Sequence, residues 1–447
     1  MTDIFMDYLS VWMVLALFMA LLMGYPVAFT LGGVAMVFGY VGLGLDFFNL
    51  LPLRLWGIMT NFTLLAVPLF VFMGVTLERS GLAEDLLETM ALLFGGIRGG
   101  MAVSVVVVGA LLAASTGIVG ATVVTMGLLA LPTMLKRNYQ PELATGVISS
   151  AGTLGQIIPP SIILVLLGDI MNVSVGDLFI AAVIPGVALV LMYMLWIVIV
   201  AAARPGLAPA IPTEERAAIS RGQLAGRVVK ALIPPALLIV AVLGSIFFGI
   251  SSPTESAAMG GMGAIALTAA NGRLSLGVLI ETMRSTTRLT CMIFIIFVGA
   301  TTFGLVFRGL GGDEIVREFI ERVPYGANGA LVMVMGVLFA LGFFLDFIEI
   351  TFIVIPIIAP IMADLGFDPI WFAILVAMNL QTSFLTPPFG FSLFYLKGVA
   401  PPSITTGHLY RGIIPFVIIQ LAALAMLIAF PDVALWLPRL AREMMFG

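Results

Sequence analysis

Long apolar runs separated by short polar segments follow one another along the whole chain. Most runs hold about 18 or more residues with few or no charges, which is the length that an α-helix needs to cross a bilayer. The pattern predicts an all-α polytopic membrane protein. The apolar runs are residues 9–23, 26–45, 61–77, 99–135, 141–168, 178–203, 229–250, 255–270, 289–307, 326–362, 369–396 and 409–430.

Two of these runs have a length that fits neither one span nor two. Residues 99–135 form 37 uncharged positions, whereas one span needs about 20 residues and two spans with a turn need more than 37. The middle of this run is small and polar, so we predict a re-entrant helical hairpin whose tip is buried in protein. Residues 326–362 have the same length, with Asp346 and Glu349 in the middle.

Two further runs are interrupted by paired prolines. Residues 141–168 would form a helix of about 42 Å at 1.5 Å per residue, longer than the hydrocarbon core of about 30 Å. Pro159-Pro160 lies well inside it, and proline removes a backbone donor and clashes with the preceding turn. We therefore expect a broken helix, whose first half ends near residues 152–156 and whose second half begins at Pro160 or Ser161. Pro387-Pro388 interrupts residues 369–396 in the same way.

The two halves of the chain match at an offset of 228 positions. The matches predict two repeats, residues 1–210 and 229–447, each with a hairpin (about 98–136 and 326–363) and a broken helix (about 141–169 and 369–397). Residues 211–228 would be a linker between them. The matched positions are Gly32-Gly33 with Gly260-Gly261, Pro132 with Pro360, Pro141 with Pro369, and Pro159-Pro160 with Pro387-Pro388.

The distribution of charge gives an orientation. The basic stretch at residues 204–230 predicts a cytoplasmic linker. Counting spans from it puts both chain ends outside, although the basic pair Arg439 and Arg442 argues against this for the C-terminus. The hairpins then open to opposite sides, so the repeats are inverted, and such repeats with broken helices are typical of secondary transporters. Three short charged segments, 82–94, 276–288 and 313–322, are predicted to be amphipathic interfacial helices.

Composition excludes several other classes of protein. The chain is 61% hydrophobic and 10% charged, with a net charge of −4, which gives no basis for binding nucleic acid. One cysteine and one histidine leave no disulfide framework, no Cys/His metal cluster and few routes to an enzyme. We find no Walker-type phosphate loop, so direct ATP drive is unsupported.

The two ends at a helix break suit opposite ions. Carbonyl and hydroxyl oxygens before the prolines suit Na⁺, and free amides after them, such as those following Pro160 and Ser161, suit a carboxylate. The hairpin tips Ser115-Thr116 and Asp346 would face these breaks. The polar residues before the second proline pair are Asn379, Gln381, Thr382, Ser383 and Thr386.

Several alternatives stay open at this point. The prolines can merely bend helices, and any single Ser or Thr hydroxyl can satisfy its own helix backbone. Asp346 and Glu349 can lie in an exposed loop between two spans. Glu255 fits a capping box with Ser252, because Ser-Pro-Thr-Glu places the acid three residues after the cap.

Three motifs resemble one known family. "GTLGQIIPPSI" (152–162), "GISSPTESAA" (249–258) and "NLQTSFLTPPFG" (379–390) are similar to segments of the large membrane subunit of tripartite ATP-independent periplasmic (TRAP) transporters. The resemblance covers essentially the whole chain. It implies Na⁺-coupled import of a small organic acid across a bacterial inner membrane by an elevator motion, without a bound cofactor. It also implies two partners, a small four-helix membrane subunit and a periplasmic substrate-binding protein.

The resemblance also implies two groups of Na⁺ candidates and a set of substrate contacts. The first ion group is Ser115, Gly117, Ser149, Ser150, Gly152 and Thr153, and the second is Asp346, Asn379, Gln381 and Thr382. The substrate-binding candidates are Ser115, Thr116, Pro160, Ser161, Thr386 and Pro388. A stand-alone Na⁺/dicarboxylate symporter of related architecture is the alternative function, and a membrane-embedded enzyme or scaffold is a remote one. The acid that is carried cannot be read from the sequence.

Overall fold

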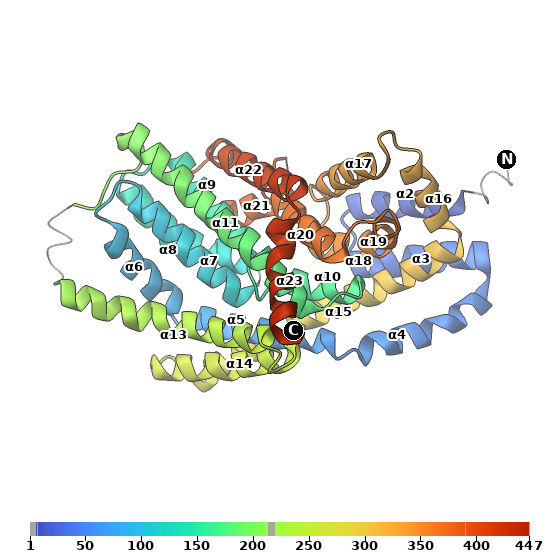
Figure 1. The fold of residues 1–447 in the computed structure, drawn as a ribbon, viewed down its shortest axis with the longest axis horizontal. Coiled ribbons are helices and arrows are strands. Elements are labelled where there is room, and N and C mark those ends of the chain that lie inside the picture. Colours follow the sequence, from blue (N-terminus) through green and yellow to red (C-terminus); the bar gives the residue numbers. More distant parts are fainter. Residues whose placement is uncertain (1–5, 7, 118, 213–219, 389, 447) are drawn as a thin grey trace.

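A computed structural model describes residue 6 and residues 8–117, 119–212, 220–388 and 390–446 of the chain. These residues form helices and no strand, as the apolar pattern predicts. Figure 1 shows an elongated arrangement with helices of the middle of the chain, α13 and α14, along the lower edge and the C-terminal helix α23 crossing the centre.

The first half of the described chain runs from α2 to α11. Short 3₁₀ turns connect some of the helices: η1 (Leu45–Leu50), η2 (Thr63–Leu65), η3 (Leu154–Gln156) and η4 (Pro205–Leu207). The α-helices are α2 (Leu9–Leu22), α3 (Val27–Leu43), α4 (Leu51–Met59), α5 (Ala66–Arg79), α6 (Leu82–Phe94), α7 (Gly100–Thr116), α8 (Val119–Lys136), α9 (Pro141–Thr153), α10 (Ile162–Ile170) and α11 (Val175–Ala203).

The second half runs from α13 to α23. Its helices are α13 (Arg221–Phe247), α14 (Pro253–Ala270), α15 (Leu276–Gly309), α16 (Gly312–Glu321), α17 (Gly326–Leu341), α18 (Phe347–Ile353), α19 (Ile355–Asp364), α20 (Pro369–Leu385), α21 (Phe391–Val399), α22 (Thr406–Ala429) and α23 (Asp432–Phe446).

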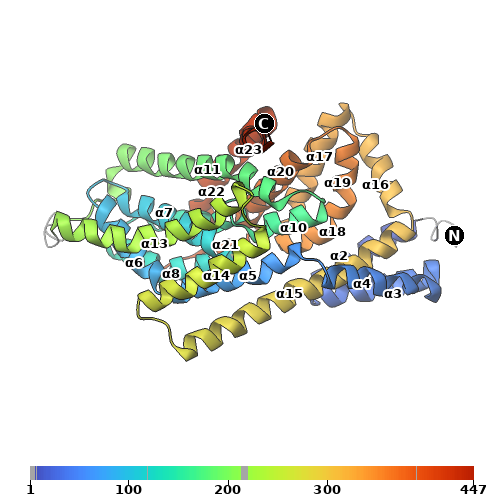
Figure 2. The ribbon, with the colours of Figure 1, turned by 60° about the horizontal axis from the view of Figure 1, so that its bottom comes forward.

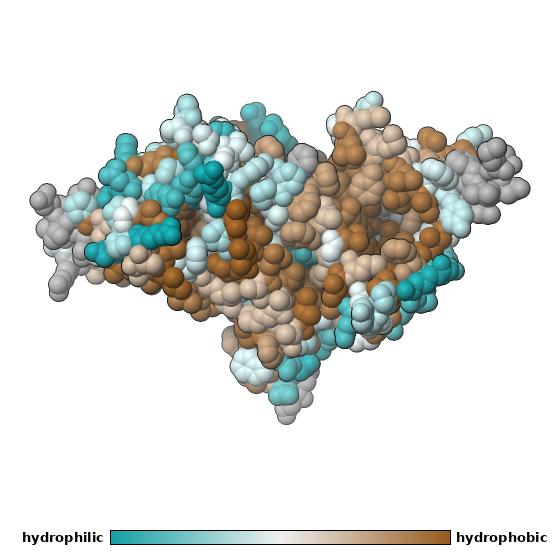
Figure 3. Space-filling view, turned by 90° about the horizontal axis from the view of Figure 1, so that it is seen from above, coloured by the Kyte–Doolittle hydropathy of each residue, from teal (hydrophilic) through white to brown (hydrophobic). Residues whose placement is uncertain are grey.

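Hydrophobic surface agrees with a protein that spans a membrane. By length and composition, five described helices can cross a bilayer, and two bent pairs raise this number to seven if each pair is one span. Many large apolar residues are exposed. Phe29, Leu53 and Phe62, for example, expose 72%, 74% and 79% of their surface. Figure 3 shows hydrophobic side chains over much of one face, with hydrophilic ones gathered over its left part and along its lower right edge.

Helices from the two halves pack against one another. The most extensive pairings join α5 with α14, α3 with α15, and α9 with α22. Figure 2 shows α3 and α15 side by side at one end of the molecule and α14 beside α5 nearer the centre. These contacts join residues that are far apart in the sequence, so the core between the halves is shared.

Helices separated by short turns occupy the residues of the two predicted hairpins, whose re-entrant character stays a prediction. α7 and α8 meet at Gly117, and α17 leads through residues 342–346 into α18 and α19, which are bent by 58° at their junction. α8 begins at Val119 and α18 begins at Phe347, and α9 and α20 begin at Pro141 and Pro369. Both pairs of helix starts are 228 positions apart.

Two boundaries differ from the sequence prediction. Residues 276–288 are not a separate interfacial helix, because they form the first turns of the 34-residue helix α15, and no proline or glycine interrupts them after Gly277. Residues 221–228 were assigned to the linker but belong to α13. A capping box starts that helix, since the Ser220 side chain accepts from Gln223 N and the Gln223 side chain accepts from Ser220 N. Residues 213–219 of the linker lie outside the described residues.

Helices are confirmed at the other two charged segments, because α6 covers residues 82–94 and α16 covers most of 313–322. Their position at the membrane interface stays a prediction. Ser252 and Glu255 form the expected capping box at the start of α14. The C-terminal arginines are paired with acids, Arg439 with Asp432 at 2.7 Å and Arg442 with Asp177 at 2.5 Å.

Candidate functional site

The first proline pair separates two half-helices as predicted. α9 ends at Thr153 and continues as the 3₁₀ turn η3 to Gln156, within the expected range. α10 begins at Ile162, just beyond the predicted start. The Pro159–Pro160 and Pro387–Pro388 peptide bonds are both cis.

The second half-helix leaves its first amides without a side-chain cap. Ser161 occupies the N-cap position, but its hydroxyl donates to the carbonyl of Gln156 at 2.8 Å, and no described side chain accepts from the first turn of α10. The free N–H groups and the positive end of the helix dipole at Ile162 therefore make a local environment that favours an anion.

Three buried side chains near this break hold polar atoms without a hydrogen-bond partner in the described part of the chain. They are Ser149 Oγ, both amide atoms of Gln156, and Gln381 Oε1. All three residues are at most 1% exposed. Because an unpaired buried polar group costs free energy, these atoms point to a ligand or ion.

The second broken helix, α20, contacts the first one beside these atoms. Gln381 Nε2 lies 3.5 Å from Thr153 Oγ1, and these two positions are 228 apart in the sequence. The structure thus brings together the predicted residues Thr153 of α9 and Gln381 of α20, and Ser149 lies one helical turn before Thr153. Gln156 was missing from the predicted site, although it lies in the same polar run before the prolines.

Most other predicted hydroxyls bond to their own helix. Each donates to a carbonyl three or four residues earlier, which was an alternative left open by the sequence. Their oxygen atoms keep lone pairs that can accept. The donors are Ser150 at 3.1 Å, Thr153 at 2.9 Å, Thr382 and Thr386 at 2.8 Å, and Ser383 at 2.9 Å.

Asn379 has a structural hydrogen bond in this structure. Its Nδ2 donates to the carbonyl of Met335 at 2.8 Å, which ties the broken helix α20 to the hairpin helix α17. A side-chain amide bonded in this way stiffens the contact between the two elements.

The tip of the first hairpin touches the start of α10. Gly117 has a φ of +60°, and a methyl group there would lie 3.2 Å from Ile162 Cγ1 and 3.4 Å from Ile162 N. Gly152 packs as closely, since its methyl group would lie 2.3 Å from Val123 Cγ2 of α8. The side chains of Ser115 and Thr116, predicted for both ion and substrate, lie outside the described part of the structure.

The tip of the second hairpin starts α18 with a capping box. Asp346 Oδ1 accepts from Phe347 N at 2.7 Å, and Glu349 Oε2 accepts from Asp346 N at 3.1 Å. The Asp-x-x-Glu spacing at residues 346–349 is the sequence signal for this cap. Both carboxylates have one oxygen engaged with the backbone, and both side chains are half-buried.

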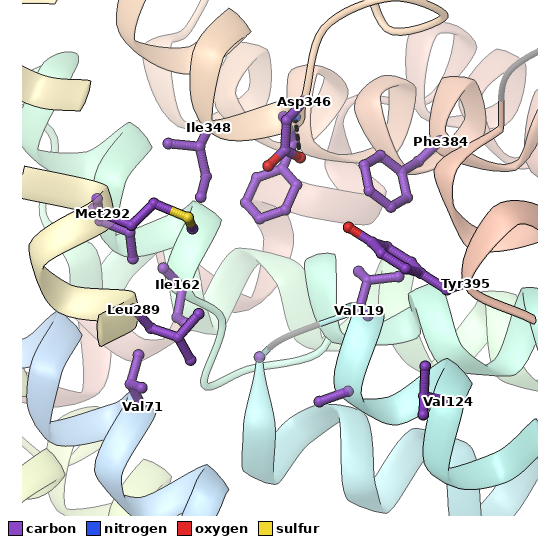
Figure 4. Close-up of a pocket in the computed structure, with 15 residues that line it drawn as sticks. Val71, Val119, Val124, Ile162, Leu289, Met292, Asp346, Ile348, Phe384 and Tyr395 are labelled. Atoms are coloured by element: carbon purple, nitrogen blue, oxygen red, sulfur yellow. Dashed lines mark hydrogen bonds between the residues drawn. The ribbon is translucent and has the colours of Figure 1, made fainter. Parts of the chain in front are cut away.

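A cavity of about 340 Å³, the central cavity, lies between the two tips (Figure 4). Gly117 and Asp346 both line it, together with side chains of α5, α8, α10, α15, α18, α20 and α21. In Figure 4 the Tyr395 hydroxyl points across the cavity in the direction of Asp346. The described substrate candidates Pro160, Ser161, Thr386 and Pro388 do not line it, and the Pro388 carbonyl accepts from Tyr410 Oη at 2.6 Å.

The described side chains do not form a metal centre built from His, Cys, Asp and Glu. The described residues hold no group of three or more His, Cys, Asp or Glu side chains that could bind a metal ion. The oxygens gathered at the breaks are therefore those of amides, hydroxyls and carbonyls, with Asp346 as the carboxylate at the edge of the central cavity.

Comparison with solved structures identifies the fold. The chain is similar to the structure described as the Alcanivorax borkumensis YdaH transporter, with a TM-score of 0.60 and 16% sequence identity. The match covers 96% of this chain and 98% of the other. The helix arrangement is thus one already seen in a transporter.

Comparison with known sequences identifies the family. The model of the DctM component of tripartite ATP-independent periplasmic transporters matches residues 14–433. The C4-dicarboxylate TRAP transporter large permease protein DctM of Pseudomonas aeruginosa is 32% identical over 87% of this chain and 89% of its own length. The ectoine TRAP transporter large permease protein TeaC of Halomonas elongata is 30% identical over 94% of this chain and 97% of its own length. The sialic acid TRAP transporter large permease protein SiaM of Vibrio cholerae is 28% identical over 93% of this chain and 95% of its own length. The chain therefore belongs to the DctM family of TRAP transporters and is a multi-pass large permease subunit, not an enzyme.

Proposed function

We propose that this permease imports a small organic acid across a bacterial inner membrane, coupled to Na⁺, together with a small membrane subunit and a periplasmic substrate-binding protein. Its relatives are named for C4-dicarboxylate, ectoine and sialic acid, so the family handles several small acids and zwitterions. One positive charge moving inward across 100 mV supplies about 2.3 kcal/mol, which favours import of an anion with two Na⁺ ions.

The observation that carries the Na⁺ proposal is the set of unpartnered buried oxygens on the two broken helices. Ser149 Oγ, Gln156 Oε1 and Gln381 Oε1 are buried without a hydrogen-bond donor from the described chain. Oxygen ligands at the C-terminal ends of half-helices suit a coupling Na⁺ in transporters. Asp346, Asn379 and Thr382 on the second hairpin and second broken helix are the candidates for a second ion.

The substrate carboxylate is proposed to bind in the central cavity. Its anionic end would lie at the uncapped start of α10, where Gly117 allows a close approach to the Ile162 amide. A Na⁺ ion near Asp346 would offset the repulsion between that carboxylate and the substrate. Coupling would then follow because substrate binds tightly only when the ion is present.

The movement is proposed to be an elevator motion of two inverted repeats. The 228-residue spacing between corresponding helix starts supports a duplicated unit, with residues 1–210 and 229–447 as the two copies. The mobile part would contain the hairpins and broken helices, α7–α10 and α17–α21. The paired helices α3 with α15 and α5 with α14 would belong to the static part, together with the small subunit.

Uptake by proteoliposomes that contain the two membrane subunits tests the proposal. Radiolabelled acid, presented by the binding protein, should accumulate only with an inward Na⁺ gradient, and replacing Na⁺ by K⁺ should abolish accumulation. Equal uptake without Na⁺ would overturn the coupling, and equal uptake without the binding protein would favour a stand-alone symporter.

Asp346 gives the sharpest variant for this assay. Asp346→Ala should lower Na⁺-driven uptake at least about 100-fold, because it removes the charge and the cap of α18. Asp346→Asn keeps a capping oxygen, so it should restore thermal stability but not Na⁺ dependence. Unchanged Na⁺ dependence in both variants would remove Asp346 from the ion site.

A further inference from the structure

The walls of the central cavity are chemically uneven. Asp346 and Tyr395 are the polar side chains among its described lining residues. Figure 4 shows Val71, Leu289 and Met292 together on the opposite side, with Ile162 beside them. These side chains come from α5, α15 and α10, so the side chains of this wall are apolar and its polar groups are the backbone amides at the start of α10.

The described lining contains no Lys or Arg. A substrate with two carboxylates would therefore place its second charge against apolar side chains or beside the Asp346 carboxylate, with no cationic side chain as a partner, which is costly. A single carboxylate has a partner in the uncapped amides of α10. The Tyr395 hydroxyl can donate to one further acceptor, such as a 2-oxo or 2-hydroxy oxygen beside that carboxylate.

We infer that this permease carries monocarboxylates with an apolar body, of the branched aliphatic or aromatic 2-oxo acid class, in preference to dicarboxylates. The inference rests on the proposed function, since it assumes that the central cavity is the substrate site. A volume of about 340 Å³ lies at the small end of the usual range for ligand sites, which is about 300–1,000 Å³. Each methylene group buried against the wall should improve binding about fourfold.

Cysteine protection tests this preference on the permease itself. Cys291 is free and exposed, so it is first replaced by Ser, and Met292→Cys then places a thiol at the apolar wall. Met283→Cys, on the same helix and 55% exposed in the native side chain, is the matched control outside the cavity. The permease is purified with its small membrane subunit and labelled with a maleimide in Na⁺ or K⁺.

The ligands are succinate, 4-methyl-2-oxopentanoate and phenylpyruvate, without binding protein. In Na⁺ but not in K⁺, both 2-oxo acids should slow labelling of the cysteine at position 292. The concentration that halves the labelling rate should be at least about tenfold lower for each 2-oxo acid than for succinate. The cysteine at position 283 should be labelled at the same rate throughout.

Each other outcome overturns the inference in a recognisable way. Equal or better protection by succinate would reject the substrate class while leaving Na⁺-coupled transport intact. No protection by any acid, with Na⁺-driven uptake still present in the three-component assay, would show that the central cavity is not the substrate site. Absence of Na⁺-driven uptake of every acid would overturn the proposed function as well.

Discussion

The two broken helices carry the same proline pair but satisfy their polar groups differently. Before Pro159-Pro160, Ser149 Oγ and the Gln156 amide are buried without a partner in the described chain. Before Pro387-Pro388, the hydroxyls of Thr382, Ser383 and Thr386 donate to their own helix, and Asn379 donates to Met335. The first junction thus has more unpartnered polar atoms than the second, where Gln381 Oε1 is the unpartnered one among the described candidates.

The two hairpin tips differ in a complementary way. The first tip turns at Gly117 in a left-handed conformation and presses on the start of α10. The second tip turns at Asp346, which caps α18 and lines the central cavity. The first half of the chain therefore contributes neutral oxygens and amides to the proposed site, and the second half contributes the carboxylate together with Gln381. Substitutions at the two junctions should have unequal effects.

The largest structural effect is expected at Gly342, in the second hairpin. A methyl group there would lie 2.0 Å from Ser383 Oγ and 2.5 Å from Ser383 Cβ. Because the Cβ cannot rotate away, Gly342→Ala should destabilise the protein by about 2–3 kcal/mol, seen as a lower thermal midpoint in detergent. Ser383→Gly in the same chain should recover part of the loss, and a double variant no better than Gly342→Ala would contradict this packing.

Gln156→Leu should separate ion binding from stability at the first junction. It removes a proposed oxygen ligand, so the apparent Na⁺ affinity of uptake should fall about tenfold, or about 1.4 kcal/mol. Thermal stability should stay equal or rise, because an unpartnered buried amide is replaced by an apolar group. The control is Gln420→Leu, a buried glutamine of α22, which should leave Na⁺ affinity unchanged. A loss of Na⁺ affinity in both variants would count against a specific role for Gln156.

Gly117→Ala tests the tip of the first hairpin. The positive φ of +60° disfavours any Cβ by about 1 kcal/mol, while the nearest contacts of 3.2–3.4 Å require only a small shift. Thermal stability should fall less than in Gly342→Ala, but the maximal uptake rate should fall several-fold. An uptake rate equal to that of the unmodified permease would show that this tip does not have to approach α10.

The smallest effect is expected for Thr386→Val at the second junction. The Thr386 hydroxyl is half-buried and donates to Thr382 O at 2.8 Å, so the loss should be at most about 1 kcal/mol of stability and less than twofold in uptake. A tenfold loss of Na⁺ affinity here would reverse the comparison between the two junctions.

Local signals in the sequence predict much of this fold. The proline pairs locate both helix breaks, and run lengths locate both hairpins. Spacing predicts the capping box of Ser252 and Glu255, and the same rule applied to Asp346 and Glu349 would have predicted the cap of α18. The capping box of Ser220 and Gln223, which shortens the linker, follows the same spacing rule but was not predicted.

Other features depend on contacts that no local pattern records. Residues 276–288 read as an amphipathic helix, yet they continue into the span α15 because nothing in them ends a helix. The corresponding elements of the first half, from Leu45 to Arg79, bend by 54°. At that bend Asn61 Nδ2 donates to Asp169 Oδ1 at 2.5 Å, 108 positions away.

The sequence alone determined that this is a membrane protein whose helices break at two proline pairs 228 positions apart, because hydrophobic length and missing backbone donors act locally. Only the tertiary structure decided which polar atoms are free. It pairs Thr153 with Gln381, satisfies the hydroxyls of the second junction, and leaves Gln156 without a partner in the described chain. Whether an oxygen can bind an ion depends on what surrounds it in space, and that is set by segments more than 200 residues apart.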